Sequence, residues 1–281
     1  MQKNLVYHCY PVAANPAWKW NLDQLRKRLP LFDGKRVIAL ALDQSTVGAE
    51  EVMEYLPGVE WIVMKNDPSL CESASWVPLW ESMRDEPGVT FRGHAKGVTN
   101  FEKELTGKFG SITEKGKVRC YQIKSTWKVL PPIPGRMETM RLWADILYRT
   151  NLDHWPLVER SLTEKPIAGS LRCNFPFRKS LRHVTGAARE FAKQFWIPWV
   201  YLGSFYWVRN EDFFRRNWRI VPQQFTGVEI WPSKNYSFKE SACLFFPTNK
   251  RFPIHRIEYM GILQEKLEKW ERHHEMVLLP Q

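Results

Sequence analysis

The stretch KRVIALALD, residues 35–43, decides the fold class of this chain. Six consecutive apolar residues, from Val37 to Leu42, follow two basic residues, and the run ends at Asp43. An uninterrupted apolar run differs from the alternation of a half-exposed strand, and it is typical of a strand that a parallel sheet buries on both faces. The stretch therefore predicts a parallel strand inside an α/β domain.

The segments around this strand repeat the same unit. Strand-like runs span residues 4–10, 59–64 and 89–92, and helical segments are expected between them at residues 16–29, 50–56 and 75–84. Asn15-Pro16 supplies a cap and a first-turn proline for the first helix. The order β-α-β-α-β-α-β predicts a mostly parallel central sheet.

Polar and small residues follow each predicted strand at its carboxyl end. They are His8, Tyr10 and Pro11 after the first strand, Asp43 after the second, Asn66 and Asp67 after the third, and His94, Lys96 and Gly97 after the fourth. Parallel sheets bind ligands outside the carboxyl ends of their strands, so these residues form the candidate ligand site. The sequence has neither the G-x-G-x-x-G nor the G-x-x-x-x-G-K-[ST] motif, which removes the main support for a dinucleotide-binding or P-loop protein.

The second half of the chain has a different character. Residues 98–136 are polar, basic and rich in glycine and proline, and they predict an inserted basic flap with a hairpin or strand near 117–129. The further predicted elements are a helical stretch at 137–162 divided near Pro156, a strand at 167–171, a basic helix at 182–195, an apolar run at 200–209 and a charged helix at 258–275. We expect one domain over residues 1–250 and a C-terminal helical appendage over 251–281.

The composition of the chain indicates which class of binding partner and which cellular compartment to expect. The 281 residues include 41 Lys and Arg against 30 Asp and Glu, a net charge of +11, which favours polyanionic partners without choosing among them. The five cysteines form no C-x-x-C pair, which is typical of reduced thiols in the cytoplasm. No apolar stretch reaches the roughly 18 residues of a membrane span. The expectation is a cytoplasmic protein without a transmembrane segment.

Several short motifs occur in an order that is found in a known family. Gly93-His94-Ala95-Lys96-Gly97 resembles the His-Thr-Lys-Gly motif of glycosyltransferase-like proteins of surface-polysaccharide type, and Gly203-Ser204-Phe205-Tyr206-Trp207 resembles their Gly-Asn-Phe-Trp-Trp motif. Between and after these motifs, the family pattern is matched by Trp143–Tyr148, His154-Trp155, Ile167-Ala168-Gly169 and Glu229-Ile230-Trp231. Ala95 and Ser204 depart from the family residues. The resemblance covers roughly residues 4–246 and implies a GT-A-like, Rossmann-type fold that binds a nucleotide sugar, for example a UDP-sugar.

The resemblance also implies a way to hold the donor diphosphate. Most GT-A enzymes hold it through Mn²⁺ or Mg²⁺ bound by an Asp-x-Asp after the fourth strand, and this sequence has no Asp-x-Asp. Lys96, together with His94, stands at that place, and a fixed cation can neutralise a leaving diphosphate. Two alternatives stay open: a structural His94 with a solvated Lys96, or a metal recruited by Asp43 or Asp67.

Donor, acceptor and base can be assigned to further residues as hypotheses. Asp43 is placed to bind ribose or base, or else to cap a turn, and Asn66 and Asp67 bind the donor or form an Asx turn before Pro68. Glu229 is the candidate catalytic base, and Glu211 and Asp212 compete with it or cap a helix. The candidate acceptor-binding residues are Trp207, Asp212 and Trp231.

Three classes of function remain at this point. The leading one is a glycosyltransferase, which the resemblance implies to be inverting, with a glycan or lipid-linked acceptor. The second is a transferase for modified DNA bases, suggested by the basic segments Lys96–Arg136, Arg178–Lys193 and Arg209–Arg219. The third is a non-catalytic protein that binds nucleic acid or carbohydrate.

Overall fold

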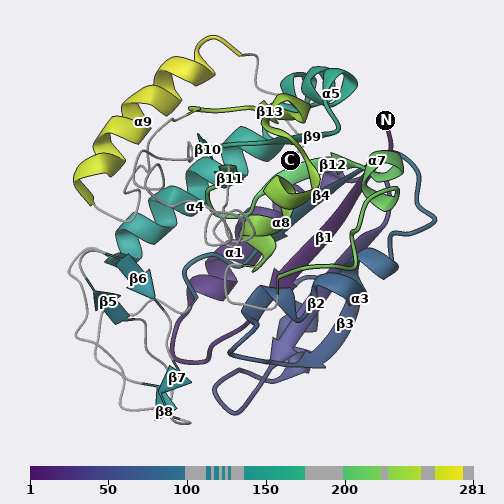
Figure 1. Cartoon of the computed structure of the whole chain (residues 1–281). Coiled ribbons are helices and arrows are strands. Elements are labelled where there is room, and N and C mark those ends of the chain that lie inside the picture. The colour runs from purple at the N-terminus through teal and green to yellow at the C-terminus, as the bar shows by residue number, and fades with distance from the viewer. Residues whose placement is uncertain are drawn as a thin grey trace, which may run out of the picture.

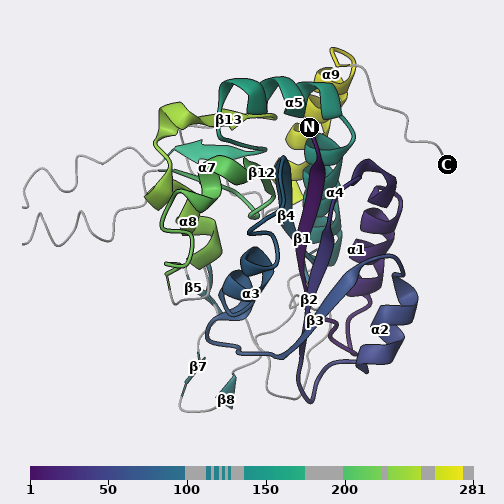
Figure 2. The ribbon, with the colours of Figure 1, turned by 90° about the vertical axis from the view of Figure 1, so that its right-hand side faces the viewer.

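The computed structural model describes residues 1–98, 112–114, 117–119, 122–123, 126–127, 136–174, 199–222, 227–247 and 257–274. Within them, a seven-stranded mixed sheet has helices on both faces (Figures 1 and 2). Figure 2 shows α3, α7 and α8 on one side of the strands and α1, α2 and α4 on the other. This three-layer arrangement confirms the predicted α/β class.

The first half of the chain forms the predicted β-α repeats. In chain order the elements are β1 (Lys3–Cys9), α1 (Ala17–Arg26), the 3-10 turn η1 (Leu29–Leu31), β2 (Arg36–Leu42), α2 (Ala49–Tyr55), β3 (Glu60–Lys65), the 3-10 turn η2 (Cys71–Ser73), α3 (Trp76–Glu81) and β4 (Val89–His94). β1 pairs in parallel with both β2 and β4, and β2 pairs in parallel with β3. The apolar run of residues 37–42 is therefore an inner strand, as its sequence predicts.

The later strands complete the sheet on the β4 side. The elements are β9 (Ile167–Gly169), β12 (Tyr206–Arg209) and β13 (Ser241–Cys243), and the whole order is β13-β9-β12-β4-β1-β2-β3. β12 runs antiparallel to both β4 and β9. The chain adds strands outward from β1 to β3 and then returns to place β4 on the other side of β1. The order therefore reverses between β1 and β4, which is the switch point where open α/β sheets bind ligands.

Helices and short strand pairs make up the remaining elements. They are α4 (Arg136–Leu152), α5 (Trp155–Glu164), α7 (Asn210–Phe214), α8 (Gly227–Asn235), the 3-10 turn η4 (Phe238–Glu240), α9 (Ile257–Glu271), and the pairs β5 (Ile112–Glu114) with β6 (Lys117–Arg119), β7 (Gln122–Ile123) with β8 (Thr126–Trp127), and β10 (Arg172–Asn174) with β11 (Trp199–Tyr201). Pro156 lies in the first turn of α5, so the predicted division of the 137–162 stretch is confirmed. The predicted basic helix at 182–195 and most of the 98–136 flap lie outside the described residues.

Two apolar cores form because successive strand residues point to opposite faces. Leu5 and Tyr7 of β1 face the core under α1, α2, α4, α5 and α9, whereas Val6 faces the core that contains residues of α3, α7 and α8. Half of the buried residues of the second core are aromatic, among them Trp76, Trp80, Phe213 and Trp231.

The C-terminal helix belongs to the larger core. Met260, Leu263 and Leu267 of α9 are buried there, and the indole of Trp270 donates a hydrogen bond of 2.9 Å to the carbonyl of Leu244. The described part of the predicted appendage, residues 257–274, therefore packs into the larger core. Among the described helices, none has the length and apolarity that crossing a bilayer requires.

Candidate functional site

The candidate site lies at the carboxyl ends of β1 and β4. His8 and His94 are register partners in the parallel β1–β4 pair, so their side chains leave the sheet at the same level. Both residues are almost fully buried. The switch point thus brings together two of the sequence-predicted residues that are 86 positions apart along the chain.

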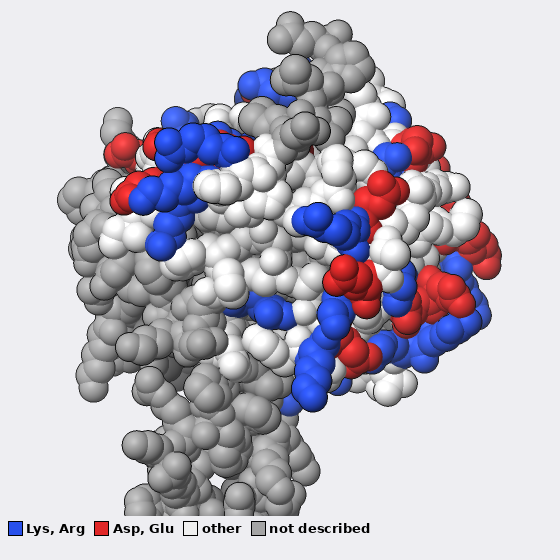
Figure 3. All heavy atoms as spheres, turned by 90° about the horizontal axis from the view of Figure 1, so that it is seen from above, with Lys and Arg blue, Asp and Glu red and all other residues white. Residues whose placement is uncertain are grey.

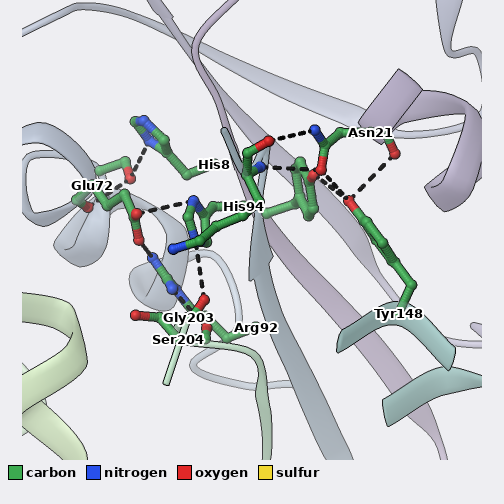
Figure 4. A network of polar contacts seen from close by, with 11 residues as sticks. His8, Asn21, Glu72, Arg92, His94, Tyr148, Gly203 and Ser204 are labelled. Atoms are coloured by element: carbon green, nitrogen blue, oxygen red, sulfur yellow. Dashed lines mark hydrogen bonds and ion pairs between the residues drawn. The ribbon is translucent and has the colours of Figure 1, made fainter. Parts of the chain in front are cut away.

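Glu72, from η2, is the centre of the polar network at this point (Figure 4). One carboxylate oxygen lies 2.9 Å from Nδ1 of His94, and the other pairs with the guanidinium of Arg92. Burial opposes ionisation of Glu72, but the charges of His94 and Arg92 outweigh it and hold the pKa of Glu72 well below its usual range. The carboxylate is therefore a fixed negative charge.

Arg92 and His94 extend this network to the turn between β11 and β12. Arg92 is only 2% exposed, and its NH1 donates a hydrogen bond of 2.7 Å to the carbonyl of Ser204. Nε2 of His94 lies 3.0 Å from the carbonyl of Gly203. A buried guanidinium must be paired and hydrogen-bonded to be tolerated, and Glu72 and Ser204 meet that need.

The tautomer of His8 follows from its partner. Its Nδ1 lies 2.8 Å from Oγ of Ser75, and that hydroxyl donates to the carbonyl of Glu72 at 3.0 Å. Since the hydroxyl proton is committed, Nδ1 of His8 is the donor. Burial lowers the pKa of His8 to about 4, so the ring is neutral near pH 7.

Lys96 follows β4 and is held mainly through its backbone. The side-chain amide of Asn21 accepts a hydrogen bond from the Lys96 N–H at 3.0 Å and donates one to the Lys96 carbonyl at 2.8 Å. Its ammonium lies 4.0 Å from the centre of the Trp143 ring. Among the described residues, no carboxylate lies within ion-pair distance of this ammonium. Burial lowers the pKa of Lys96, while Glu229 and Glu72 partly raise it.

Glu229 lies in the first turn of α8, and the start of that helix packs against the Glu72 loop. A Cβ on Gly227 would lie 1.9 Å from the carbonyl oxygen of Pro222 and 2.7 Å from Oγ of Ser73, so only glycine fits at the start of this helix. Burial raises the pKa of Glu229, and Lys96 and the backbone N–H of Gly203 work in the opposite direction. A carboxyl with a raised pKa is suited to accept a proton near neutral pH.

A second polar cluster occupies the ends of β1, β2 and β3. One oxygen of Asp43 accepts hydrogen bonds from Tyr10 at 2.8 Å and Asn66 at 2.7 Å, and the other accepts bonds from the amide and hydroxyl of Ser45. Burial opposes ionisation, yet these bonds hold the pKa of Asp43 below its usual value. Asp67 accepts from the backbone and hydroxyl of Ser69 in an Asx turn, as the alternative for that residue predicts.

These carboxylates do not fit a divalent metal. The oxygens of Asp43 and Glu72 are already paired, and Asp67 closes its own turn. In the part of the chain that the structure describes, no group of three or more His, Cys, Asp or Glu side chains is arranged to hold a metal ion. We therefore derive no step that passes through Mn²⁺ or Mg²⁺.

The predicted acceptor-binding residues lie elsewhere. Trp207 is 0% exposed, stacks on Phe32 with ring centres 5.7 Å apart and donates to the Asn151 carbonyl, so its ring is not available to an acceptor. Trp231 is equally buried, at 4.9 Å from Trp76. Both tryptophans are core residues in this structure, because each packs inward from the sheet or from α8.

The other predicted residues also have local partners. Asp212 forms an ion pair of 2.7 Å with Arg209. It lies in the first turn of α7, close to the helix start that the capping alternative for this residue predicts. Gly97 has φ +84, and a Cβ there would lie 3.0 Å from Cβ of Met140, so backbone conformation and helix packing account for this glycine. The carbonyl of Pro11 accepts from the amide of Val47. His94 has both ring nitrogens engaged and supports the site rather than facing a diphosphate.

Four residues of the site carry no assigned role in the sequence prediction: Asn21, Glu72, Arg92 and Trp143. Arg92 had the clearest signal, because an arginine inside a strand of the run Val89–His94 requires a buried anionic partner. Nothing in the sequence identifies that partner as Glu72.

Comparison with known proteins identifies no family for this chain. The chain matches no protein-family model, and no curated protein matches it significantly.

Proposed function

We propose that this chain is a glycosyltransferase that moves a sugar from a nucleotide-sugar donor to an acceptor hydroxyl. The observation that carries the proposal is the electrostatic coupling of two groups that form no ion pair: the ammonium of Lys96, which has no ion-pair partner among the described residues, and the carboxyl of Glu229, whose pKa burial raises. The two groups interact electrostatically without being in direct contact. The motif resemblance and the α/β sheet with its Rossmann-like order at β3-β2-β1-β4 agree with a GT-A-like fold.

In this proposal each group has one role. Lys96 binds the donor diphosphate and stabilises the negative charge that develops as the bond to the anomeric carbon breaks. Glu229 takes the proton of the acceptor hydroxyl while the acceptor oxygen bonds to the anomeric carbon from the opposite side. The electron pair of the broken bond leaves on the nucleoside diphosphate. A single displacement of this kind inverts the anomeric configuration.

The Asp43 cluster is the proposed support for the nucleoside. Tyr10, Ser45 and Asn66 fix the carboxylate of Asp43 beside the end of β1. Its lone pairs are largely used internally, so we propose that the cluster shapes the nucleoside side of the site.

A glycan is the acceptor class that we propose. The four arginines of the Arg209–Arg219 segment all pair with carboxylates: Arg209 with Asp212, Arg215 with Glu211, Arg216 with Glu240 and Arg219 with Glu81. Figure 3 shows one face of the molecule, and on it Lys and Arg side chains lie beside Asp and Glu. This segment therefore offers little uncompensated positive charge to a nucleic-acid backbone.

The test is a screen of nucleotide sugars for hydrolysis and transfer, with glycan acceptors and base-modified duplex DNA in parallel. Glu229→Gln should lower turnover by about 10²- to 10⁴-fold while sparing donor binding, and Lys96→Ala should weaken binding of the nucleoside diphosphate. Glu54→Gln and Lys27→Ala are matched controls on exposed side chains. Activity should persist in EDTA.

Three outcomes contradict the proposal in different ways. No turnover of any donor by the wild-type chain favours a non-catalytic binding protein. Near-normal turnover by Glu229→Gln removes the base assignment, and strict dependence on added Mn²⁺ removes the role of Lys96. Salt-sensitive transfer to modified DNA alone replaces the glycan acceptor.

A further inference from the structure

One face of α4 lies against the segment of chain that carries Lys96. Met140, Trp143 and Leu147 are spaced three and four residues apart, so their side chains share one face of the helix. A Cβ on Gly97 would lie 3.0 Å from Cβ of Met140, so the residue after Lys96 packs directly on this helix. One turn further along α4, the centre of the Trp143 ring lies 4.0 Å from the ammonium of Lys96. The helix therefore contacts both the backbone beside Lys96 and the charged end of its side chain.

The turn between β11 and β12 fixes the position of the Trp143 ring. A Cβ on Gly203 would lie 3.3 Å from Cζ2 and 3.4 Å from Cε2 of the indole, and 2.6 Å from Cδ1 of Leu147. The backbone of Gly203 therefore lies against the edge of the ring and blocks its movement to that side. A side chain at position 203 would displace either the indole or the leucine.

The indole N–H does not explain why a tryptophan stands at position 143. Nε1 of Trp143 is buried and has no hydrogen-bond partner among the described residues. Leaving a buried donor unpaired costs free energy, and a buried tryptophan N–H usually finds a partner. Leucine or phenylalanine would supply apolar area without that cost. The distinguishing contact of this indole is the ammonium over its face, and tryptophan is the aromatic side chain that attracts cations most strongly.

An aromatic face acts on an ammonium differently from a carboxylate. A carboxylate would neutralise Lys96 and would compete with the oxygens of a bound diphosphate. The indole attracts the cation through its quadrupole and has no formal charge, so the positive charge of Lys96 stays available to a ligand. The ring occupies one side of the ammonium, and the three N–H donors can turn toward an anion on the other sides.

The backbone of Lys96 is braced from the same helix. Tyr148 of α4 donates a hydrogen bond of 3.1 Å to the amide oxygen of Asn21 (Figure 4). Asn21 in turn bonds to both the N–H and the carbonyl of Lys96. Lys96 is thus held at its backbone by Asn21 and at its charged end by Trp143. A lysine that is ordered before the ligand arrives loses less rotamer freedom on binding, which favours affinity.

We propose that Trp143 is a positioning residue for Lys96, whose ammonium the indole face orders for the donor diphosphate without neutralising it. The inference deepens the proposed function and rests on it for the identity of the ligand. The contact between ring and ammonium can be tested without turnover.

The first test follows the ε-methylene group of Lys96 by proton–carbon NMR, with the signal assigned by its loss in Lys96→Met. Because an aromatic ring lies over the ammonium, this signal should lie upfield of that of a solvent-exposed lysine. The upfield shift should vanish in Trp143→Met and persist in Trp143→Phe, which keeps a ring. It should also persist when inorganic pyrophosphate saturates the wild type, because the ring and the anion occupy different sides of the ammonium.

The second test measures pyrophosphate binding by calorimetry. Trp143→Met should weaken binding roughly 2- to 30-fold, the change that corresponds to one cation–π contact, and Trp143→Phe should weaken it less. In a Lys96→Met background, Trp143→Met should have no further effect, because the tryptophan acts through the lysine. The matched control is Trp155→Met, which removes a partly buried indole whose ring centre lies 5.2 Å from the ammonium of Lys3 at the start of β1. It should leave pyrophosphate binding unchanged.

Each opposite result overturns a stated part of the inference. An unshifted ε-methylene signal in the wild type overturns the contact, and this result needs no variant of Trp143 to fold. A shift that disappears when pyrophosphate binds, or unchanged binding by Trp143→Met, overturns the positioning role. A full effect of Trp143→Met in the Lys96→Met background overturns it as well, because the indole then touches the ligand itself.

The proposed function and the positioning role fail in different ways. If the wild type binds pyrophosphate as expected but turns over no nucleotide sugar, the proposed transferase activity fails and the positioning of Lys96 stands. If the wild type turns over a donor but Trp143→Met binds pyrophosphate like the wild type, the activity stands and the positioning fails. No pyrophosphate binding by the wild type overturns the inference.

Discussion

Asn21 fixes the backbone of Lys96, and replacing it by alanine tests whether the ammonium is pre-positioned. Asn21 is fully buried on α1, and its amide group satisfies both the N–H and the carbonyl of Lys96. The hydroxyl of Tyr148 donates to the same amide oxygen at 3.1 Å and also lies 2.6 Å from the hydroxyl of Tyr7. In Asn21→Ala, Tyr148 keeps a partner, but the two backbone groups of Lys96 lose theirs.

The magnitude follows from those two groups. Leaving a buried donor or acceptor without a partner costs about 1–3 kcal/mol each. Because Lys96 is only partly buried, water replaces some of the lost bonding. We therefore expect the free energy of unfolding to fall by about 2–4 kcal/mol. With Lys96 no longer held, binding of a nucleoside diphosphate should weaken as well.

Urea unfolding and calorimetric titration with a nucleoside diphosphate measure the two effects. The matched control is Asn235→Ala, which removes a single hydrogen bond of 3.1 Å to the Trp231 carbonyl on α8 and should cost under about 1 kcal/mol. The reasoning is refuted if Asn21→Ala costs no more than the control. If Asn21→Ala loses the expected stability but binds the diphosphate as well as the wild type does, only the claim that Asn21 positions Lys96 is refuted.

Three further predictions follow from burial, backbone and charge. Gly203→Ala should lower the free energy of unfolding by about 1–3 kcal/mol in urea, because φ is +94 and the methyl group meets Leu147; an unchanged midpoint would contradict this. Trp207→Phe should lower stability but leave acceptor KM unchanged, since the ring is buried; a raised KM with normal stability would return Trp207 to the acceptor site. Glu72 has a depressed pKa in the folded chain, so its contribution to stability is present above its unfolded pKa and is lost as pH falls through the folded value; Glu72→Gln should flatten this acid dependence, measured as unfolding midpoint against pH.

The sequence predicts the sheet well because its signals are local. The apolar run of residues 37–42 and the turns at Pro57-Gly58 and Pro87-Gly88 fix the strands and their order along the chain. No local signal in the sequence shows on which side of β1 the strand β4 pairs, or that β12 enters the sheet as an antiparallel strand. Those depend on how helices cover the two faces, which no short pattern records.

The tryptophans show that residue type alone does not predict which side chains line the site. The sequence predicts Trp207 and Trp231 as acceptor residues because an indole can stack on a sugar, but an indole also supplies a large apolar area to a core. Only the packing partners distinguish the two uses, and here these are Phe32 for Trp207 and Trp76 for Trp231. Trp143, beside Lys96, is instead the aromatic ring at the site.

The charged residues of the site are explained better by the proposed reaction than by stability. Replacing a buried ion pair by apolar residues is often neutral or stabilising, so packing does not require Glu72 and Arg92. The formal charges of Glu72, Arg92, Lys96 and Glu229 cancel, and a protonated His94 adds one positive charge to the cluster. Under the proposed mechanism, the proton that Glu229 takes from the acceptor removes one negative charge and leaves the cluster with a net positive charge. That charge arises beside Lys96 in the step in which the diphosphate departs, so proton transfer and leaving-group stabilisation support each other electrostatically.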